Sequence, residues 1–221
     1  MHALSRFLLC TLCAVTLAGC SSDPDLQKKL SSLPLMRKSA PQVAPGFAAA
    51  QKAQAPAFIT APEDRPDVVA VFRRQALSDT SGVGTWIAGD GSQIMLDHGI
   101  VVGTRGFGGD ILAADVSDVL PLVQTLRAGV VTHLITQIDG DDHAITRAFK
   151  CEISREEPGS VQIGTQAVAT QTMVEDCRSS DTSFVNYYWV VPATGEIVQS
   201  SQWAGPLLKR VSIRKIVPAK Q

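Results

Sequence analysis

The chain has 221 residues, of which 45% are hydrophobic and 19% are charged, a composition typical of a globular protein with one domain. Lys and Arg number 20 and Asp and Glu number 21, so the formal net charge is −1. Nothing in the sequence resembles the basic stripe by which nucleic-acid-binding domains are recognised, and we expect no nucleic-acid partner.

Residues 1–19 have the layout of a secretory signal peptide. Arg6 is followed by an apolar stretch from Phe7 to Leu17, and then by small residues before a cleavage point. The cleavage point leads directly into Cys20, and Leu17-Ala18-Gly19-Cys20 resembles a bacterial lipobox, at which the cysteine thiol receives a diacylglyceryl group. We predict a lipoprotein signal peptide over 1–19 and a mature chain anchored to a membrane by acyl chains (palmitate) on Cys20. The alternative is an ordinary signal peptide with a chance cysteine.

The segment that follows, 20–64, is predicted to be a tether. It holds half of the 12 prolines, is rich in alanine and shows little strand patterning, so it buries too little apolar surface to fold alone. No apolar run after Cys20 approaches the roughly 20 residues that cross a bilayer, so we expect a lipid-held domain over 65–221. Two alternatives stay open: a short amphipathic helix over Leu26–Met36, and a domain that already begins at Phe58 and Ile59.

Beyond Pro66 short β-rich runs alternate with polar turns, a pattern typical of an antiparallel meander. The segments Asp139–Asp142 and Glu156–Ser160 are predicted to be turns. Both faces of the hairpin 187–200 are partly apolar, which suits the middle of a sandwich or a barrel. The predicted strands are 68–72, 84–88, 93–96, 100–104, 130–138, 144–153, 161–174, 187–191, 196–200 and 211–217.

A single helix is predicted between the strands, with Asp118 as its N-cap and Gly129 as its C-terminal stop. The predicted fold class is mainly β, an antiparallel barrel or sandwich-like domain with one short α-helix, preceded by a disordered tether. The apolar face of the helix recurs at three- and four-residue steps, in Val116, Val119, Leu120, Val123 and Leu126.

The five cysteines differ in what we expect of them. Cys10 and Cys13 leave with the signal peptide and Cys20 carries lipid, so Cys151 and Cys177 remain. In an exported protein these two are expected to form a disulfide, whose loop of about 26 residues contributes roughly 3–4 kcal/mol on the chain-entropy estimate. Two reduced thiols, or one reactive thiol, are the alternatives. No metal site is predicted, because no nearby histidine or third cysteine completes a ligand set.

No motif of the sequence points to catalysis or to a cofactor. The glycine cluster Gly103–Asp110 lacks the Lys-Ser/Thr pair and the helix of a phosphate-binding loop, so we expect a turn there, with Arg105 a candidate for a binding groove. His133, inside a predicted strand, is expected to be a core histidine. We predict no enzyme, no cofactor and no metal. A glycan-processing enzyme stays an alternative, because its two carboxylates come from separate strands and leave no motif.

Four aromatic residues gather within seventeen positions: Tyr187, Tyr188, Trp189 and Trp203. Flat aromatic rings suit a sugar-binding face or a protein interface, although core packing explains such a cluster as well. In a regular hairpin Trp189 faces Val198, and alternation places Tyr188 on the opposite face. The candidate binding residues are Tyr187, Trp189, Trp203 and Arg105.

The order of these features resembles the YjbF/GfcB-type lipoproteins of exopolysaccharide and group 4 capsule loci. The resemblance extends from about Asp67 to Pro218, behind a lipobox and a tether. One departure is Ile100, where a basic residue is expected. The matching features are Trp86 before a Gly-Asp-Gly turn, the strand Gly99–Gly106 ending near Asp110, Cys151 in a strand, Cys177 after Glu175-Asp176, the run Asn186–Val190 and Trp203 at the end of a hairpin.

The resemblance implies an outer-membrane lipoprotein of mainly β, barrel-like fold that is accessory to the secretion or assembly of an exopolysaccharide or capsule and carries out no catalysis. Ser21 after the lipidated cysteine fits outer-membrane sorting. The expected location is the outer membrane, lipid-anchored and facing the periplasm. The expected partners are polysaccharide export or assembly proteins, or the polysaccharide itself. The alternative is a lipid- or lipoprotein-binding periplasmic β-barrel.

Overall fold

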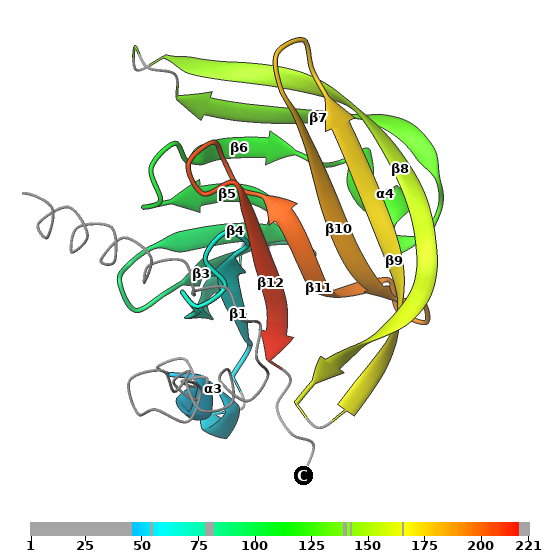
Figure 1. Ribbon diagram of the computed structural model, residues 1–221. Coiled ribbons are helices and arrows are strands. Elements are labelled where there is room, and N and C mark those ends of the chain that lie inside the picture. The colour runs from blue at the N-terminus through cyan, green and yellow to red at the C-terminus, as the bar shows by residue number, and fades with distance from the viewer. Residues whose placement is uncertain are drawn as a thin grey trace, which may run out of the picture. The chain divides into compact units, whose positions relative to one another are not determined.

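The computed structural model describes residues 46–53, 55–77, 82–138, 141, 143–164 and 166–216, which lie within one compact unit, Val43–Gln221. This unit is a single sheet of 12 antiparallel strands that curls into a nearly closed barrel (Figure 1). The prediction of a mainly β, antiparallel fold is confirmed. No helix among the described residues is long and apolar enough to span a membrane.

The sheet consists of two meanders joined where the first strand pairs with the last. The first contains β1 (Ala57–Pro62), β2 (Ala70–Leu77), β3 (Val83–Ile87), β4 (Gln93–Asp97) and β5 (Ile100–Arg105). The second contains β6 (Ile111–Asp115), β7 (Gly129–Ile138), β8 (Ala144–Ile163), β9 (Gln166–Arg178), β10 (Ser183–Val191), β11 (Glu196–Trp203) and β12 (Arg210–Ile216). Two helices are described, α3 (Phe47–Ala53) and α4 (Val119–Gln124).

The folded part of the chain begins earlier than position 65. Strand β1 lies between β2 and β12 in the sheet, and Phe58 is 1% exposed. Helix α3 precedes it, with Ala50 packed against Val71 and Ile216. The alternative start at Phe58 therefore agrees with the structure, because β1 is the strand that joins the two meanders. The predicted signal peptide, the predicted lipidation site Cys20 and the possible helix over 26–36 lie outside the described residues.

Strand β8 is longer than predicted, and the predicted turn over Glu156–Ser160 is wrong. The strand continues through this segment with an irregularity between Arg155 and Pro158, and the chain reverses at Gly164 instead (Figure 1). Proline donates no ladder hydrogen bond, and a bulge is the place where a strand tolerates one. The side-chain amide of Gln171 donates to the carbonyl of Glu156 within this irregularity.

Helix α4 lies where a helix was predicted, but it is short. Asp118 occupies the N-cap position without a side-chain capping hydrogen bond. The helix ends at Gln124, and Leu126 has a φ of +57°, so the chain turns away before the predicted stop. Val119 and Val123 are fully buried and pack with interior residues of the barrel, so the apolar face of the helix was predicted correctly.

The barrel closes at β5 and β6, the two ends of the sheet, through side chains. The Arg105 guanidinium donates to the carbonyl oxygens of Ile111 and Leu112 at 2.9 and 3.2 Å. Thr104 Oγ1 accepts from the Ile111 amide at 3.0 Å and donates to Asp110 Oδ1 at 2.8 Å. The glycine cluster is thus a turn at a strand end, as predicted, and its polar residues join the two sheet edges.

Candidate functional site

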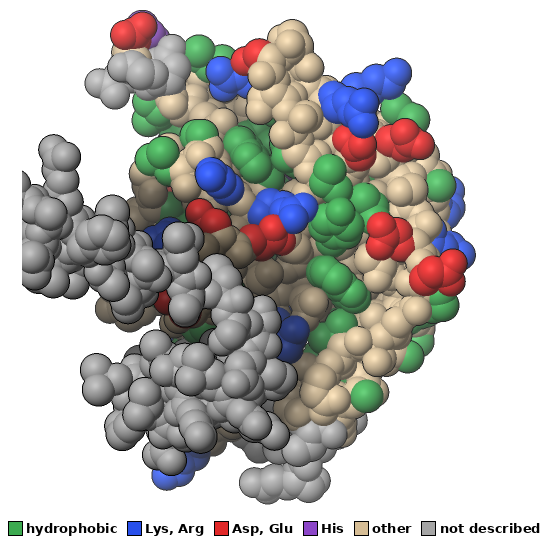
Figure 2. All heavy atoms as spheres, viewed as in Figure 1, with side chains coloured by type: hydrophobic (Ala, Val, Ile, Leu, Met, Phe, Trp, Pro, Cys, Tyr) green, Lys and Arg blue, Asp and Glu red, His purple; other side chains and the backbone are tan. Residues whose placement is uncertain are grey.

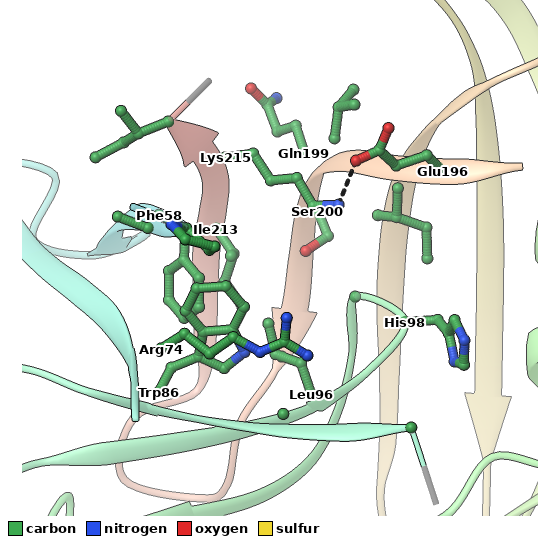
Figure 3. Close-up of a pocket in the computed structure, with 18 of the residues that line it drawn as sticks. Phe58, Arg74, Trp86, Leu96, His98, Glu196, Gln199, Ser200, Ile213 and Lys215 are labelled. Atoms are coloured by element: carbon green, nitrogen blue, oxygen red, sulfur yellow. Dashed lines mark hydrogen bonds and ion pairs between the residues drawn. The ribbon is translucent and has the colours of Figure 1, made fainter. Parts of the chain in front are cut away.

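A cavity of about 740 Å³ opens between the first meander and strands β11 and β12. We call it the barrel cavity. Its polar lining includes Arg74, His98, Glu196, Gln199, Ser200 and Lys215. Its apolar lining includes Phe58, Trp86, Leu96, Ile197, Ile213 and Ile216. Figure 3 shows Phe58, Trp86 and Arg74 together on one side of the cavity and His98 across from them.

Strand pairing explains why these side chains meet. Arg74 lies directly opposite Trp86 on the neighbouring strand, and Phe58 lies opposite both Phe72 and Lys215. Side chains that face each other in a register point to the same side of the sheet. Strands β1, β2 and β3 from the start of the domain and β12 from its end therefore contribute to one wall.

The indole of Trp86 is held by its neighbours and still reaches the cavity. Its ring centroid lies 4.7 Å from that of Phe58, and Phe58 in turn stacks on Phe72 at 5.3 Å. The Arg74 guanidinium lies 5.8 Å from the centre of the indole, within the range of a cation–π contact. Phe58 is fully buried and Trp86 only partly, so the indole combines a fixed position with an accessible surface.

An ion pair joins β11 and β12 in the lining of the cavity. Lys215 Nζ is 2.6 Å from Glu196 Oε1 (Figure 3). Both side chains are more than a third exposed, and such a pair contributes at most about 1 kcal/mol to stability. Its charges are therefore available to a ligand at little cost to the fold.

The chemistry of this lining favours binding. Hydrolysis of a glycosidic bond needs two carboxyl groups on either side of the scissile bond. Among the described residues that line the barrel cavity, Glu196 is the only carboxylate, and it is paired with Lys215. Trp86, Arg74 and Ser200 instead offer a flat ring and hydrogen-bond donors.

A second polar site, fully buried, lies inside the barrel around Glu175. Its Oε2 accepts hydrogen bonds from the Tyr188 hydroxyl at 2.6 Å and the Asn186 amide at 2.8 Å. Its Oε1 lies 2.8 Å from His133 Nδ1. An ionised carboxylate only accepts hydrogen bonds, so Nδ1 carries the hydrogen in this contact.

Burial and hydrogen bonding act in opposite directions on Glu175. Burial raises its pKa, but the hydrogen bond and charge of His133, together with the Tyr188 and Asn186 donors, outweigh burial and hold the pKa below its ordinary value. For Tyr188, burial first and the Glu175 charge second raise the pKa well above its ordinary value. The structure thus holds an ionised carboxylate and a neutral phenol in its core.

The predicted disulfide between Cys151 and Cys177 is confirmed, and it lies beside this carboxylate. The two cysteines face each other across β8 and β9 and are fully buried. One potential ligand atom from each of His133, Cys151, Glu175 and Cys177 lies within 4.8 Å of the others. The sequence showed no histidine near the cysteines because His133 comes from the adjacent strand β7.

A known protein family matches most of this chain. Residues 39–216 match the family described as group 4 capsule polysaccharide lipoprotein GfcB, YjbF. The chain belongs to this family. The resemblance noted in the sequence is confirmed, and the protein is a lipoprotein of the capsule polysaccharide group. No curated protein matches the chain.

The fold of this GfcB/YjbF-family member has been seen before. The crystal structure of the hypothetical lipoprotein YmcC from Escherichia coli (K12) matches it with a TM-score of 0.67. The two chains are 18% identical, and the match covers 91% of this chain and 100% of that one. At this identity the likeness shows the shared fold alone.

None of the four candidate binding residues lines the barrel cavity of this family member. Trp203 stacks on Phe184 at 5.2 Å within the main core. Tyr187 and Trp189 lie near each other on β10, partly exposed, with the Arg210 guanidinium 5.3 Å from the Tyr187 ring. Figure 2 shows hydrophobic side chains over this part of the barrel among charged ones of both signs. Arg105 belongs to the barrel closure.

The predicted register of the hairpin is wrong by one residue beyond its turn. Val191 pairs with Glu196 as expected, but a bulge between Trp189 and Val190 moves Gln199, in place of Val198, opposite Trp189. The alternation itself is confirmed: Tyr188 is fully buried, while Trp189 is partly exposed. A bulge of this kind leaves no clear mark in a sequence.

Two sets of residues were missed as sites. Glu175 lies opposite Asn186, and both point inward with Tyr188, a placement that follows from the i, i+2 spacing of two neighbouring strands. The residues of the barrel cavity were missed because they meet only when β1 pairs with β12. Trp86 was noted in the sequence as part of the family resemblance, but no binding role was predicted for it.

Proposed function

We propose that this lipoprotein is held at the outer membrane, faces the periplasm and assists the secretion or assembly of its polysaccharide without catalysis, by binding glycan in the barrel cavity. The observation that carries the proposal is the Trp86 wall, where a partly exposed indole is fixed by Phe58 and flanked by the Arg74 guanidinium. Membership of the capsule polysaccharide family supports the choice of ligand.

The cavity has the parts that recognition of a sugar requires. An indole face accepts the apolar face of a pyranose ring, and we take the energy of this contact as about 0.5–1.5 kcal/mol, the figure for a pair of aromatic side chains. Arg74 and Lys215 place cationic groups along the lining, where they would bind hydroxyl or carboxylate oxygens of the sugar. The volume of about 740 Å³ falls in the range of pockets that enclose a small ligand.

A lipid- or lipoprotein-binding barrel is the second candidate. The observation that favours it is the number of apolar side chains in the lining, among them Phe58, Leu96 and Ile213. An acyl chain would fill this part of the cavity without using Arg74 or Lys215. A catalytic role would need a second carboxylate beside Glu196.

Binding of the mature, lipidated protein in detergent micelles to the polysaccharide purified from the producing cells tests the proposal. Trp86→Ala should weaken binding roughly two- to tenfold, the equivalent of one aromatic contact. Trp189→Ala, which removes an indole from the outer wall of the barrel, is the matched control and should bind normally. Equal binding by both variants and the wild type would contradict the cavity as the glycan site.

A fluorescent fatty-acid probe and an assay for new reducing ends separate the alternatives. We expect no release of reducing ends from the polysaccharide. Probe binding that Trp86→Ala abolishes, in protein that does not bind the polysaccharide, would replace the glycan proposal with the lipid-binding one. Loss of polysaccharide binding in Trp189→Ala alone would move the site to the outer wall.

A further inference from the structure

The four side chains around the disulfide come from three adjacent strands and point into the same buried space. His133 lies on β7, Cys151 on β8, and Glu175 and Cys177 on β9, and none is more than 3% exposed. The barrel cavity is lined by other residues. This cluster is therefore separate from the proposed glycan site.

Two polar atoms in the cluster are not satisfied by hydrogen bonds while the disulfide is intact. Cys177 Sγ lies 3.2 Å from Glu175 Oε1, yet a disulfide sulphur carries no hydrogen to donate. His133 Nε2 is buried without a hydrogen-bond partner. Buried polar atoms are normally satisfied, and an exception calls for an explanation. A thiol at Cys177 would donate to Glu175, and a cation between the four groups would bind both the Glu175 oxygen and the lone pair of His133 Nε2.

We infer that, when the Cys151–Cys177 disulfide is reduced, His133, Cys151, Glu175 and Cys177 form a four-ligand site for a divalent cation of the zinc class. Zn²⁺ takes thiolate, imidazole and carboxylate ligands in a tetrahedral arrangement. The inference is independent of glycan binding.

The distances fit such a site after small movements. With metal–ligand bonds of about 2.0–2.3 Å, tetrahedral ligand atoms lie roughly 3.3–3.8 Å apart. The four candidate atoms already lie within 4.8 Å of one another. Once the S–S bond is broken the two sulphurs can separate to this distance, because each belongs to its own strand. The movements are on the order of an ångström.

The surroundings already hold the carboxylate in place for this role. Tyr188 and Asn186 donate hydrogen bonds to Oε2 of Glu175 and fix its position. The other oxygen, Oε1, faces His133 and Cys177. Hydrogen bonds to the far side of a ligand orient it and are a regular feature of metal sites. In its neutral form His133 carries its ring hydrogen on Nδ1, in the contact with Glu175, and Nε2 then offers its lone pair to the metal.

The reaction balances with a phosphine as reductant. The phosphine and one water become a phosphine oxide, and the disulfide takes up two electrons and two protons to become two thiols. Zn²⁺ then binds both sulphurs and releases two protons. Two thiolates, one carboxylate, a neutral imidazole and Zn²⁺ carry a net charge of −1, whereas the two thiolates and the carboxylate alone would carry −3. The cation therefore offsets most of the charge that burial would penalise.

Cobalt titration of the mature protein in detergent micelles, reduced with tris(2-carboxyethyl)phosphine under nitrogen, tests the inference. We expect one Co²⁺ per reduced chain, with the thiolate-to-cobalt charge-transfer band and the visible bands of tetrahedral Co²⁺, and displacement by Zn²⁺. The oxidised protein should show none of these bands. The double variant Cys151→Ser/Cys177→Ser should lack the charge-transfer band. Any Co²⁺ that it still binds lies at another site and gives the background of the titration.

Two histidine variants test the ligand set. His133→Gln should weaken cobalt binding at least tenfold and alter the visible bands. His143→Gln, at an exposed position, is the control and should titrate like the wild type. Normal binding by His133→Gln, or the same binding by oxidised and reduced protein, would overturn the inference.

A folding measurement covers the case in which reduction unfolds the chain. Circular dichroism of the reduced protein should show recovery of the β spectrum when Zn²⁺ is added, because a metal that binds only the folded form stabilises it. Reduced protein that stays folded without binding Co²⁺ would contradict the inference. So would reduced protein that unfolds and is not recovered by Zn²⁺.

Discussion

Tyr188 donates its hydroxyl hydrogen to Glu175 across 2.6 Å, and neither side chain is exposed to solvent. Tyr188 comes from β10 and Glu175 from β9, so the contact ties neighbouring strands together inside the barrel. A buried carboxylate needs several donors to remain ionised, and this one has Tyr188, Asn186 and His133. The stability of the barrel should therefore depend on each of them.

Removing the hydroxyl of Tyr188 should destabilise the protein. Tyr188→Phe keeps the ring and leaves Glu175 Oε2 with one donor fewer, which costs about 1–3 kcal/mol for a charged acceptor. The free energy of unfolding from urea titration measures the loss. Tyr187→Phe changes the neighbouring, partly exposed ring by the same atom and should cost less than about 0.5 kcal/mol. Equal costs would contradict a special role for the buried contact.

The stability supplied by Glu175 should depend on pH in one direction. Its pKa in the folded protein lies below the ordinary value of 4.5, so folding favours the ionised form. The contribution is fully present above pH 4.5 and is lost as the pH falls through the lower folded pKa. The difference in unfolding free energy between the wild type and Glu175→Gln should therefore shrink between pH 6 and pH 3. A difference that stays constant over this range would contradict the assignment.

Gly99 should tolerate a side chain less well than Gly91. Both have positive φ angles, +103° and +87°, so alanine strains the backbone at each. A Cβ at Gly99 would also lie 2.9 Å from the Cβ of Ile197, whereas a Cβ at Gly91 meets nothing within 4 Å. Gly99→Ala should cost about 1–3 kcal/mol more than Gly91→Ala, because of overpacking. Thermal unfolding of the two variants side by side gives the difference, and equal midpoints would count against close contact between the β4–β5 turn and β11.

The lipid anchor should matter for function and not for folding. Cys20→Ser removes the thiol that is predicted to accept the diacylglyceryl group. We expect the variant to leave the membrane fraction or keep its signal peptide, and to fail in polysaccharide export while its β domain gives a normal circular dichroism spectrum. A Cys20→Ser strain with full export would make the anchor incidental.

The sequence predicts contacts between residues that are close along the chain better than contacts between residues that are far apart. The hairpin of β10 and β11 was predicted because its turn, Pro192–Gly195, lies between two alternating runs. The bulge beside Trp189 was not, because a one-residue insertion in a register has no local signature. The same holds for β8, which passes through Pro158 with an irregularity in its pairing with β9.

The candidate sites were harder to predict than the strands. Trp86 and Lys215 share a cavity because β1 pairs with β12 at the two ends of the described domain, a contact that no local pattern indicates. His133 reaches the cysteines through the pairing of β7 with β8. The concentration of aromatic residues along the sequence pointed instead to Trp189 and Trp203. Trp189 packs on the outer wall of the barrel, and Trp203 packs in the core.

Surface polysaccharide in cells that carry Trp86→Ala in place of the wild-type gene tests the central claim most directly. With equal amounts of protein in the membrane fraction, we predict that surface polysaccharide falls toward the level of a strain that lacks the protein, while Trp189→Ala retains the wild-type level. Wild-type export by a folded, membrane-held Trp86→Ala protein would contradict the account.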